Sequence, residues 1–173
     1  PRCPRRRSRR GRSTDHGWGG RGFQLSSFVG PLVAAGRTVV LLDAPGHGEA
    51  GGRQSSVVAF AQTLKEATGR FGPASGVITH SLGAMSTIVA LAEGLATERV
   101  AFLAPGSSLE RAAKRFQQTV GVPEATMQAL RGLMEVRFQR SWDYYSLPRL
   151  RLQVPLVVVH DRDDPEVPLS ETE

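Results

Sequence analysis

Apolar side chains recur in short blocks with two different spacings along most of this 173-residue chain. Compact runs rich in Val, Ile, Leu and Ala have the length of strands, at residues 38–42, 76–79, 99–103 and 156–159. Longer segments carry apolar groups at helical spacing, at residues 24–35, 54–68, 82–95, 108–119 and 123–138. Short apolar strands that alternate with helices predict an α/β fold, in which helices cover both faces of a parallel sheet.

Residues 1–15 break this pattern because they contain no aliphatic side chain. Residues 1–14 hold seven arginines and no acid, so the formal charge of +6 comes from this segment and the rest of the chain is about neutral. We expect residues 1–15 to be a solvated basic arm, or a misread stretch that replaces a true strand. Such an arm could bind anionic surfaces, but without interleaved aromatic residues it predicts no specific nucleic-acid partner.

The composition argues against several other classes of protein. No apolar run approaches the roughly 18 residues that a membrane span needs. The N-terminus has no apolar segment of the kind found in secretory signals. The single cysteine, Cys3, cannot form an internal disulfide, so nothing indicates an oxidising compartment. We therefore expect a cytoplasmic protein without a membrane span, and the sequence leaves its oligomeric state open.

The residues that end each predicted strand are the candidates for chemistry, because ligands of an open α/β sheet bind outside the carboxyl ends of its strands. The run Thr79-His80-Ser81-Leu82-Gly83 leads from a predicted strand directly into a predicted helix. A serine on such a tight turn stands clear of the sheet, and the next backbone N–H faces the reacting centre. Thr79 would crowd this turn, and the alternative interpretation is that Ser81 simply caps the helix.

Two further segments bear on the same site. Residues 16–20, HGWGG, form a flexible loop that could direct a backbone N–H at an oxyanion beside Ser81, although alone they would indicate only a loop. Residues 160–168, HDRDDPEVP, place a cluster of carboxylates at the end of the last predicted strand. This cluster is either a solvated acidic turn or the source of a carboxylate that orients a catalytic histidine.

Together with DAPGHG at residues 43–48, these motifs resemble the α/β-hydrolase superfamily, in order and in spacing, over residues 16–173. The resemblance implies that Ser81 is the nucleophile. It also implies that the backbone N–H groups of Trp18 and Leu82 form the oxyanion hole. A serine at this turn is typical of the serine-hydrolase branch rather than of the dehalogenase and epoxide-hydrolase branches, which use aspartate there.

The resemblance also implies the reaction. It identifies Asp164 as the triad acid, with Asp161 and Asp163 as adjacent competitors that fit the motif spacing less well. The implied activity is hydrolysis of an ester, thioester or similar acyl bond of a small molecule through an acyl-enzyme. No metal and no organic cofactor are implied.

A small helical cap is implied over residues 108–147. The aromatic residues of this segment that could line an acyl or alcohol pocket are Trp142, Tyr144 and Tyr145. Ordinary packing of a cap explains them equally well, so the pocket and the packing interpretations both remain open.

Two parts of the family's pattern are missing from this sequence. The family's base is a histidine roughly 20–35 residues past the acid, whereas nine residues follow Asp164. The histidines of the chain all stand in other roles, at His16, His47, His80 and His160. We therefore expect residues 16–173 to be a partial domain, truncated at its C-terminus, that lacks the triad base and is impaired.

The second missing part is a central strand before His16. In the family an apolar strand leads into the oxyanion loop, and we expect the Arg-rich residues found here not to fill its place. Two other functions remain open beside the enzyme. One is a non-catalytic, hydrolase-like scaffold that binds a ligand in the same pocket, and the other is an anion-binding protein that acts through the basic arm.

Overall fold

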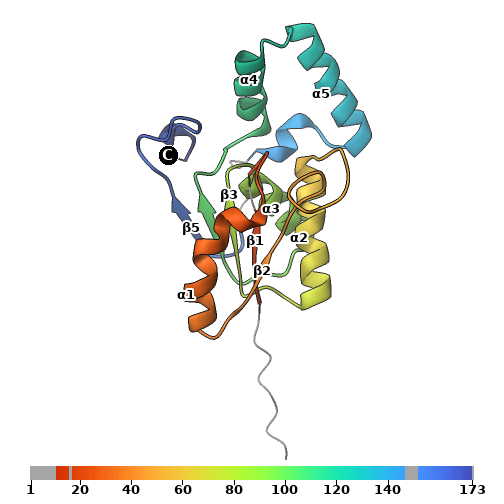
Figure 1. Ribbon diagram of the computed structural model, residues 1–173. Helices are drawn as coiled ribbons and strands as arrows, with labels where there is room; N and C mark the ends of the chain where they lie inside the picture. Colours follow the sequence, from red (N-terminus) through yellow and green to blue (C-terminus); the bar gives the residue numbers. More distant parts are fainter. Residues whose placement is uncertain (1–10, 16, 147–151, 173) are drawn as a thin grey trace, which may run out of the picture.

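The computed structural model describes residues 11–15, 17–146 and 152–172. Its described strands form one parallel five-stranded sheet in the order β2-β1-β3-β4-β5 (Figure 1). The strands are β1 (Gly11–Asp15), β2 (Thr38–Leu41), β3 (Gly76–His80), β4 (Val100–Leu103) and β5 (Leu156–Val159). Because all five run in the same direction, the loops that follow them gather at one edge of the sheet.

The interior strand β1 corrects a prediction. The sequence predicts that residues 1–15 leave the place before His16 unfilled, but Gly11–Asp15 pair with β2 on one side and β3 on the other. Ser13, for example, is in register with both Val40 and Val77. The prediction was wrong for these residues because ladder bonds are made by backbone N–H and C=O groups, which every non-proline residue supplies. Residues 1–10 and His16 lie outside the described residues, so the expected basic arm stays a prediction there.

Helices cover the two faces of the sheet. Figure 1 shows α1 (Val29–Ala34) on one side, and α2 (Val57–Phe71) and α3 (Leu82–Ala92) on the other. Ser56 caps the N-terminus of α2, because its hydroxyl oxygen accepts a hydrogen bond from the Ala59 N–H at 3.1 Å. A short 3-10 segment, η1 (Gly22–Phe28), precedes α1.

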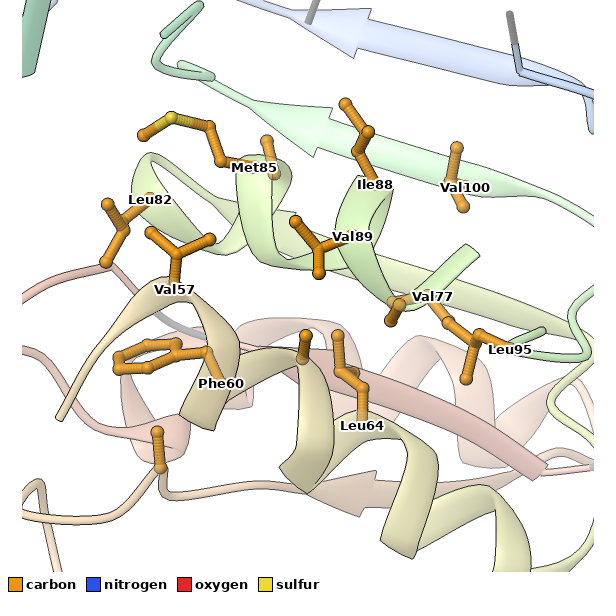
Figure 2. Packing of buried hydrophobic residues seen from close by; sticks show 14 of the residues in the cluster. Val57, Phe60, Leu64, Val77, Leu82, Met85, Ile88, Val89, Leu95 and Val100 are labelled. Atoms are coloured by element: carbon orange, nitrogen blue, oxygen red, sulfur yellow. The ribbon is translucent and has the colours of Figure 1, made fainter. Parts of the chain in front are cut away.

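The core lies between α2, α3 and β3. One face of α2 is buried at Val57, Phe60 and Leu64, and every residue of α3 from 82 to 90 is buried. Figure 2 shows these side chains packed against each other beside Val77 of β3. A helix made almost entirely of apolar and small residues must be enclosed, and the hydroxyls of Ser86 and Thr87 donate to carbonyl oxygens within α3 itself.

Residues 108–146 form a helical subdomain that joins this core at Tyr145. The helices predicted over 108–119 and 123–138 are found as α4 (Leu109–Val120) and α5 (Glu124–Phe138). None of the residues of these two helices, all of which the structure describes, is buried. The following 3-10 turn η2 (Trp142–Tyr145) does bury Trp142 and Tyr145. Figure 1 shows α4 and α5 standing away from the sheet and its covering helices.

Candidate active site

Ser81 stands at a sharp turn between β3 and α3. Its backbone angles are φ 51° and ψ −115°, in the left-handed region that L residues other than glycine rarely adopt. The turn is held by neighbouring backbone, because the Ser81 N–H donates to the Leu103 carbonyl oxygen at 3.0 Å. The Ser81 carbonyl oxygen accepts from the N–H groups of Ala84 at 3.1 Å and Gly106 at 3.4 Å. Strain of this kind costs on the order of 1–3 kcal/mol and persists only where the surroundings enforce it.

The side chain of Ser81 does not behave as a helix cap. Ser56 and Ser108, which do cap α2 and α4, have extended backbones and accept hydrogen bonds from Ala59 and Arg111. Ser81 has a positive φ, and within the described residues its hydroxyl makes no capping hydrogen bond. The hydroxyl of this half-buried residue therefore does not cap α3.

Thr79 lies two residues before Ser81, where the sequence analysis expected crowding. The structure buries Thr79 completely, and its hydroxyl oxygen has no hydrogen-bond partner among the described residues. Leaving a buried hydroxyl without a partner costs about 1–3 kcal/mol. The turn thus forms in spite of Thr79, at a cost to stability.

The predicted oxyanion loop lies directly against this turn. The Gly20 N–H donates to the Gly17 carbonyl oxygen at 3.1 Å, and Gly19 has φ 72°, so residues 17–20 close a tight turn that needs glycine. A Cβ atom placed on Gly17 would lie 3.1 Å from Ser81 Cβ and 3.0 Å from His80 Nδ1. The loop therefore lies close to the serine, and the role of its backbone N–H groups as an oxyanion hole stays a prediction.

The Trp18 side chain extends from the loop toward His47 and Phe60. It is 63% exposed, and its ring meets the ring of His47 edge-on with centroids 5.3 Å apart. His47 in turn has its Nδ1 atom 3.1 Å from the Pro45 carbonyl oxygen. These contacts place the DAPGHG turn beside the oxyanion loop.

Asp43 is a site residue for which the sequence analysis assigned no role. Its Oδ1 accepts a hydrogen bond from the Gly22 N–H at 2.7 Å, and its Oδ2 accepts one from the Glu49 N–H at 2.8 Å. A Cβ on Gly48 would overlap Oδ2, at 2.1 Å. Asp43 thus ties the segment after the oxyanion loop to the loop after β2. The sequence feature that could have indicated this role is an aspartate at the start of a turn rich in glycine and proline.

Asp164 is held at the end of β5 by backbone donors. Its Oδ1 accepts hydrogen bonds from the N–H groups of Val167 at 2.9 Å and Glu166 at 2.8 Å. These two bonds hold the pKa of the Asp164 carboxyl below its ordinary value, with small further contributions from His160 and His80.

The competing carboxylates differ from Asp164 in their surroundings. Asp161 and Asp163 are exposed, and Asp161 Oδ1 only accepts the Asp163 N–H at 3.0 Å within the turn. The Asp164 side chain is 17% exposed and its Oδ2 lies 3.8 Å from His160 Nε2. The choice of Asp164 as the acid is consistent with this geometry and stays a prediction.

His160 is enclosed under the acidic turn. Its side chain is 2% exposed, with Nδ1 2.9 Å from Thr172 Oγ1 and Nε2 2.7 Å from the Val167 carbonyl oxygen. Both ring nitrogens are therefore engaged within the turn itself. This residue supports the acidic turn and is not free to reach Ser81.

Two of the three cap aromatic residues that could contact substrate, Trp142 and Tyr145, lie in different places. Trp142 borders a cleft of about 270 Å³ between α4, α5 and η2, whose other walls are largely polar and charged. Its backbone N–H donates to Glu135 Oε1 at 2.7 Å, and the Arg131 guanidinium lies 5.9 Å from its ring centroid. Tyr145 belongs to the main core cluster, where burial raises the pKa of its hydroxyl. Trp142 therefore fits either interpretation of the cap aromatics, whereas Tyr145 fits packing.

The described residues contain no group of three or more His, Cys, Asp or Glu side chains placed to hold a metal ion. Within the described ranges, every helix is too short or too polar to cross a membrane.

A family model and the similar solved structures indicate the same family. A sequence model of the Alpha/beta hydrolase family matches residues 15–171. No curated protein sequence matches the chain significantly. Among solved structures, a monoacylglycerol lipase from Paleococcus ferrophilus is similar at 17% identity, with a TM-score of 0.66 over 95% of this chain and 78% of the lipase.

Two other solved structures show a similar fold. An esterase from Pyrococcus furiosus has 19% identity and a TM-score of 0.65, over 95% of this chain and 66% of the esterase. An extracellular alpha/beta-hydrolase from a Paenibacillus species has 13% identity and a TM-score of 0.60, over 92% of this chain and 80% of that protein. The chain thus spans between about two thirds and four fifths of the length of these relatives.

Proposed function

Because this chain belongs to the alpha/beta hydrolase family, we propose that it is a serine hydrolase for an ester, thioester or similar acyl bond of a small molecule. The observation that supports this best is the backbone of Ser81, held at φ 51° beside the turn of the oxyanion loop. A capping serine needs no such strain, whereas a nucleophile must be lifted clear of the sheet. The similarity to solved esterases and a lipase supports the fold beneath this proposal.

The proposed reaction has two steps on Ser81. The Ser81 oxygen attacks the acyl carbon while a base takes its proton, and the backbone N–H groups of Trp18 and Leu82 bind the oxyanion. The bond to the leaving oxygen or sulfur then breaks, and that atom receives the proton. Water attacks the acyl-serine in the same way, which releases the carboxylic acid and restores the Ser81 hydroxyl. In this proposal Asp164 orients the base.

The base is the part of the proposal that the described histidines do not supply. His160 is engaged at both ring nitrogens, and His47 Nδ1 lies at the Pro45 carbonyl oxygen. His80 precedes Ser81 in the chain, with its ring beside Gly17. We therefore expect a formed nucleophile and oxyanion hole that work slowly until a base is provided.

A labelling experiment with added imidazole tests this proposal. A fluorophosphonate probe is incubated with the whole chain, and intact mass and peptide mapping locate the adduct. Ser81 is expected to be labelled slowly, and neutral imidazole is expected to accelerate the labelling about tenfold or more, because imidazole supplies the base that the described histidines do not. Ser81→Ala should abolish the adduct, whereas Ser56→Ala, which removes a capping hydroxyl, should leave it unchanged.

The same experiment separates the enzyme from a non-catalytic scaffold. The observation that favours the scaffold is the enclosure of His160, which leaves Asp164 without a free imidazole partner among the described residues. A scaffold would remain unlabelled at Ser81 at every imidazole concentration, and that result would overturn the proposed hydrolase.

A further inference from the structure

The Trp18 side chain belongs to a cluster of three aromatic rings that come from three segments of the chain. Trp18 lies in the oxyanion loop, His47 in the turn after β2, and Phe60 on α2. The Trp18 and Phe60 rings are stacked, with an angle of 14° between their planes and centroids 6.5 Å apart. The His47 ring meets both of them edge-on, at 5.3 Å from Trp18 and 5.1 Å from Phe60. All three separations lie in the range of favourable aromatic pairs.

Phe60 connects this cluster to the core. Its side chain is completely buried and belongs to the core cluster, where Figure 2 shows it beside Val57 of the same helix. A side chain enclosed in a close-packed core has little room to move. Phe60 therefore provides fixed support for the other two rings.

His47 is held by the backbone of its own turn. Its N–H donates to the Ala44 carbonyl oxygen at 2.9 Å, and its carbonyl oxygen accepts from the Ala50 N–H at 2.9 Å. Its ring atom Nδ1 lies 3.1 Å from the Pro45 carbonyl oxygen. A carbonyl oxygen only accepts hydrogen bonds, so this contact requires a proton on Nδ1. The imidazole ring is thus fixed in place where it meets Trp18 and Phe60.

Trp18 has neighbours in sequence that do little to fix its backbone. Gly17 precedes it, and Gly19, with φ 72°, follows it. Glycine adopts many backbone conformations, so these neighbours alone do not set the direction of the Trp18 N–H. Within residues 17–20 Trp18 is the one residue that is not glycine. The ring contacts of Trp18 therefore restrain the backbone that carries the proposed oxyanion donor.

We propose that His47 is a positioning residue that, together with Phe60, holds the Trp18 ring and thereby directs the Trp18 backbone N–H at the oxyanion. This inference rests on the proposed hydrolase function. An oxyanion donor lowers the barrier only when it already points at the developing charge. A Trp18 ring that loses its support therefore slows the attack by Ser81 although the nucleophile itself is intact.

Three replacements of His47 separate the effect of its ring from that of its hydrogen bond. His47→Phe keeps a ring against Trp18 and Phe60 but loses the Nδ1 donor. His47→Asn keeps an N–H donor near the position of Nδ1 but loses the ring, and His47→Ala loses both. Arg53→Ala is the matched control, since Arg53 is an exposed residue of the same connection between β2 and α2.

The first measurement is the rate at which a fluorophosphonate labels Ser81 in the whole chain with added imidazole. His47→Ala and His47→Asn should slow the labelling about fivefold or more, because the oxyanion donor is no longer held in place. His47→Phe restores the ring and should label within about twofold of the wild-type rate. Arg53→Ala should label at the wild-type rate.

Replacing Trp18 itself tests whether His47 acts through this ring. Trp18→Ala keeps the backbone N–H but removes the ring, so it should slow labelling about as much as His47→Ala does. Adding His47→Ala to Trp18→Ala should cause no further loss, because both replacements remove the same contact. Losses that add in the double variant would contradict the proposal.

The second measurement is the time-resolved fluorescence anisotropy of Trp18. It is made in a Trp142→Phe background, which leaves Trp18 as the one tryptophan of the chain. The fast part of the anisotropy decay reports nanosecond motion of the indole ring. Its amplitude should increase in His47→Ala and His47→Asn and stay at the wild-type value in His47→Phe.

The outcomes distinguish this inference from the proposed hydrolase. Wild-type labelling in His47→Ala and His47→Asn would overturn the positioning role, and so would equal slowing by all three replacements of His47. Trp18 is 63% exposed, so Trp18→Ala provides the test if a His47 variant folds poorly, and wild-type labelling in it would also overturn the role. A wild-type chain that is not labelled at Ser81 would overturn the hydrolase, and the anisotropy of Trp18 then decides by itself whether His47 holds the ring.

Discussion

At the scale of single residues, the candidate site depends on backbone conformations that few side chains tolerate. Ser81 adopts a positive φ although it is not glycine, and Gly17 fits against it because it has no Cβ. The strained turn places the Ser81 side chain clear of the sheet. Because Gly17 has no Cβ, the loop can approach that side chain closely.

Gly17→Ala should reduce the reactivity of Ser81 without unfolding the protein. The added Cβ lies 3.1 Å from Ser81 Cβ and 3.0 Å from His80 Nδ1, so the loop or the serine must move by a few tenths of an ångström. A displacement of this size in a site that binds an oxyanion is expected to slow fluorophosphonate labelling about tenfold. Gly51→Ala is the control, because nothing lies within 4 Å of a Cβ at Gly51. Equal labelling rates in the two variants would contradict contact between the loop and the nucleophile.

At the scale of elements, the strands with apolar runs and the helices with apolar faces could be predicted from periodicity alone. The strand β1 could not, because Gly11–Asp15 have no apolar pattern and their pairing is made by the backbone. The Ser81 turn was recognisable because its residues are adjacent in sequence. The contact made by the buried Glu171 carboxylate was not, because its partners Ser107 and Arg115 are 64 and 56 residues away and nothing in the local sequence links them. Ser107 donates to this carboxylate through its N–H and its hydroxyl, and the Arg115 guanidinium pairs with it.

The Glu171 contact predicts how stability depends on pH. Burial raises the pKa of the Glu171 carboxyl, but the Ser107 donors and the Arg115 guanidinium more than offset burial, so the pKa lies below its ordinary value in the folded chain. The folded state therefore binds fewer protons than the unfolded state in acid. Its stabilising contribution is fully present above the unfolded pKa, whose reference value is 4.5, and is lost as the pH falls through the lower folded pKa. Glu171→Gln removes this contribution at neutral pH, at a cost of about 1–3 kcal/mol.

Urea unfolding at pH 7, 5, 4 and 3 measures this effect. The free energies of unfolding of the wild type and Glu171→Gln should differ most at pH 7 and 5 and converge toward pH 3. Asp164, whose pKa is also lowered, titrates in both proteins and cancels in the difference. A gap of constant size across this pH range would show that the ionised carboxylate does not stabilise the fold.

At the scale of the whole molecule, the sheet ends in an apolar edge. The strand β5 pairs with β4 on one side, and all four of its residues are exposed. The side chains of Val157 and Val159 are 59% and 57% exposed on one face, with Leu156 and Val158 on the other.

An exposed apolar edge strand is expected to pair with other chains, so the protein should self-associate as its concentration rises. Val157→Lys places a charge on this edge and should raise the concentration at which light scattering begins by several-fold, because a lysine must be desolvated for the strands to pair. Val33→Lys is the matched control, since Val33 is 55% exposed but lies on α1, which offers no strand edge. If both variants shifted the onset equally, general solubility rather than edge pairing would account for the association. If only Val157→Lys shifts it, β5 is the surface through which copies of the chain meet, and any segment that covers β5 should suppress the association in the same way.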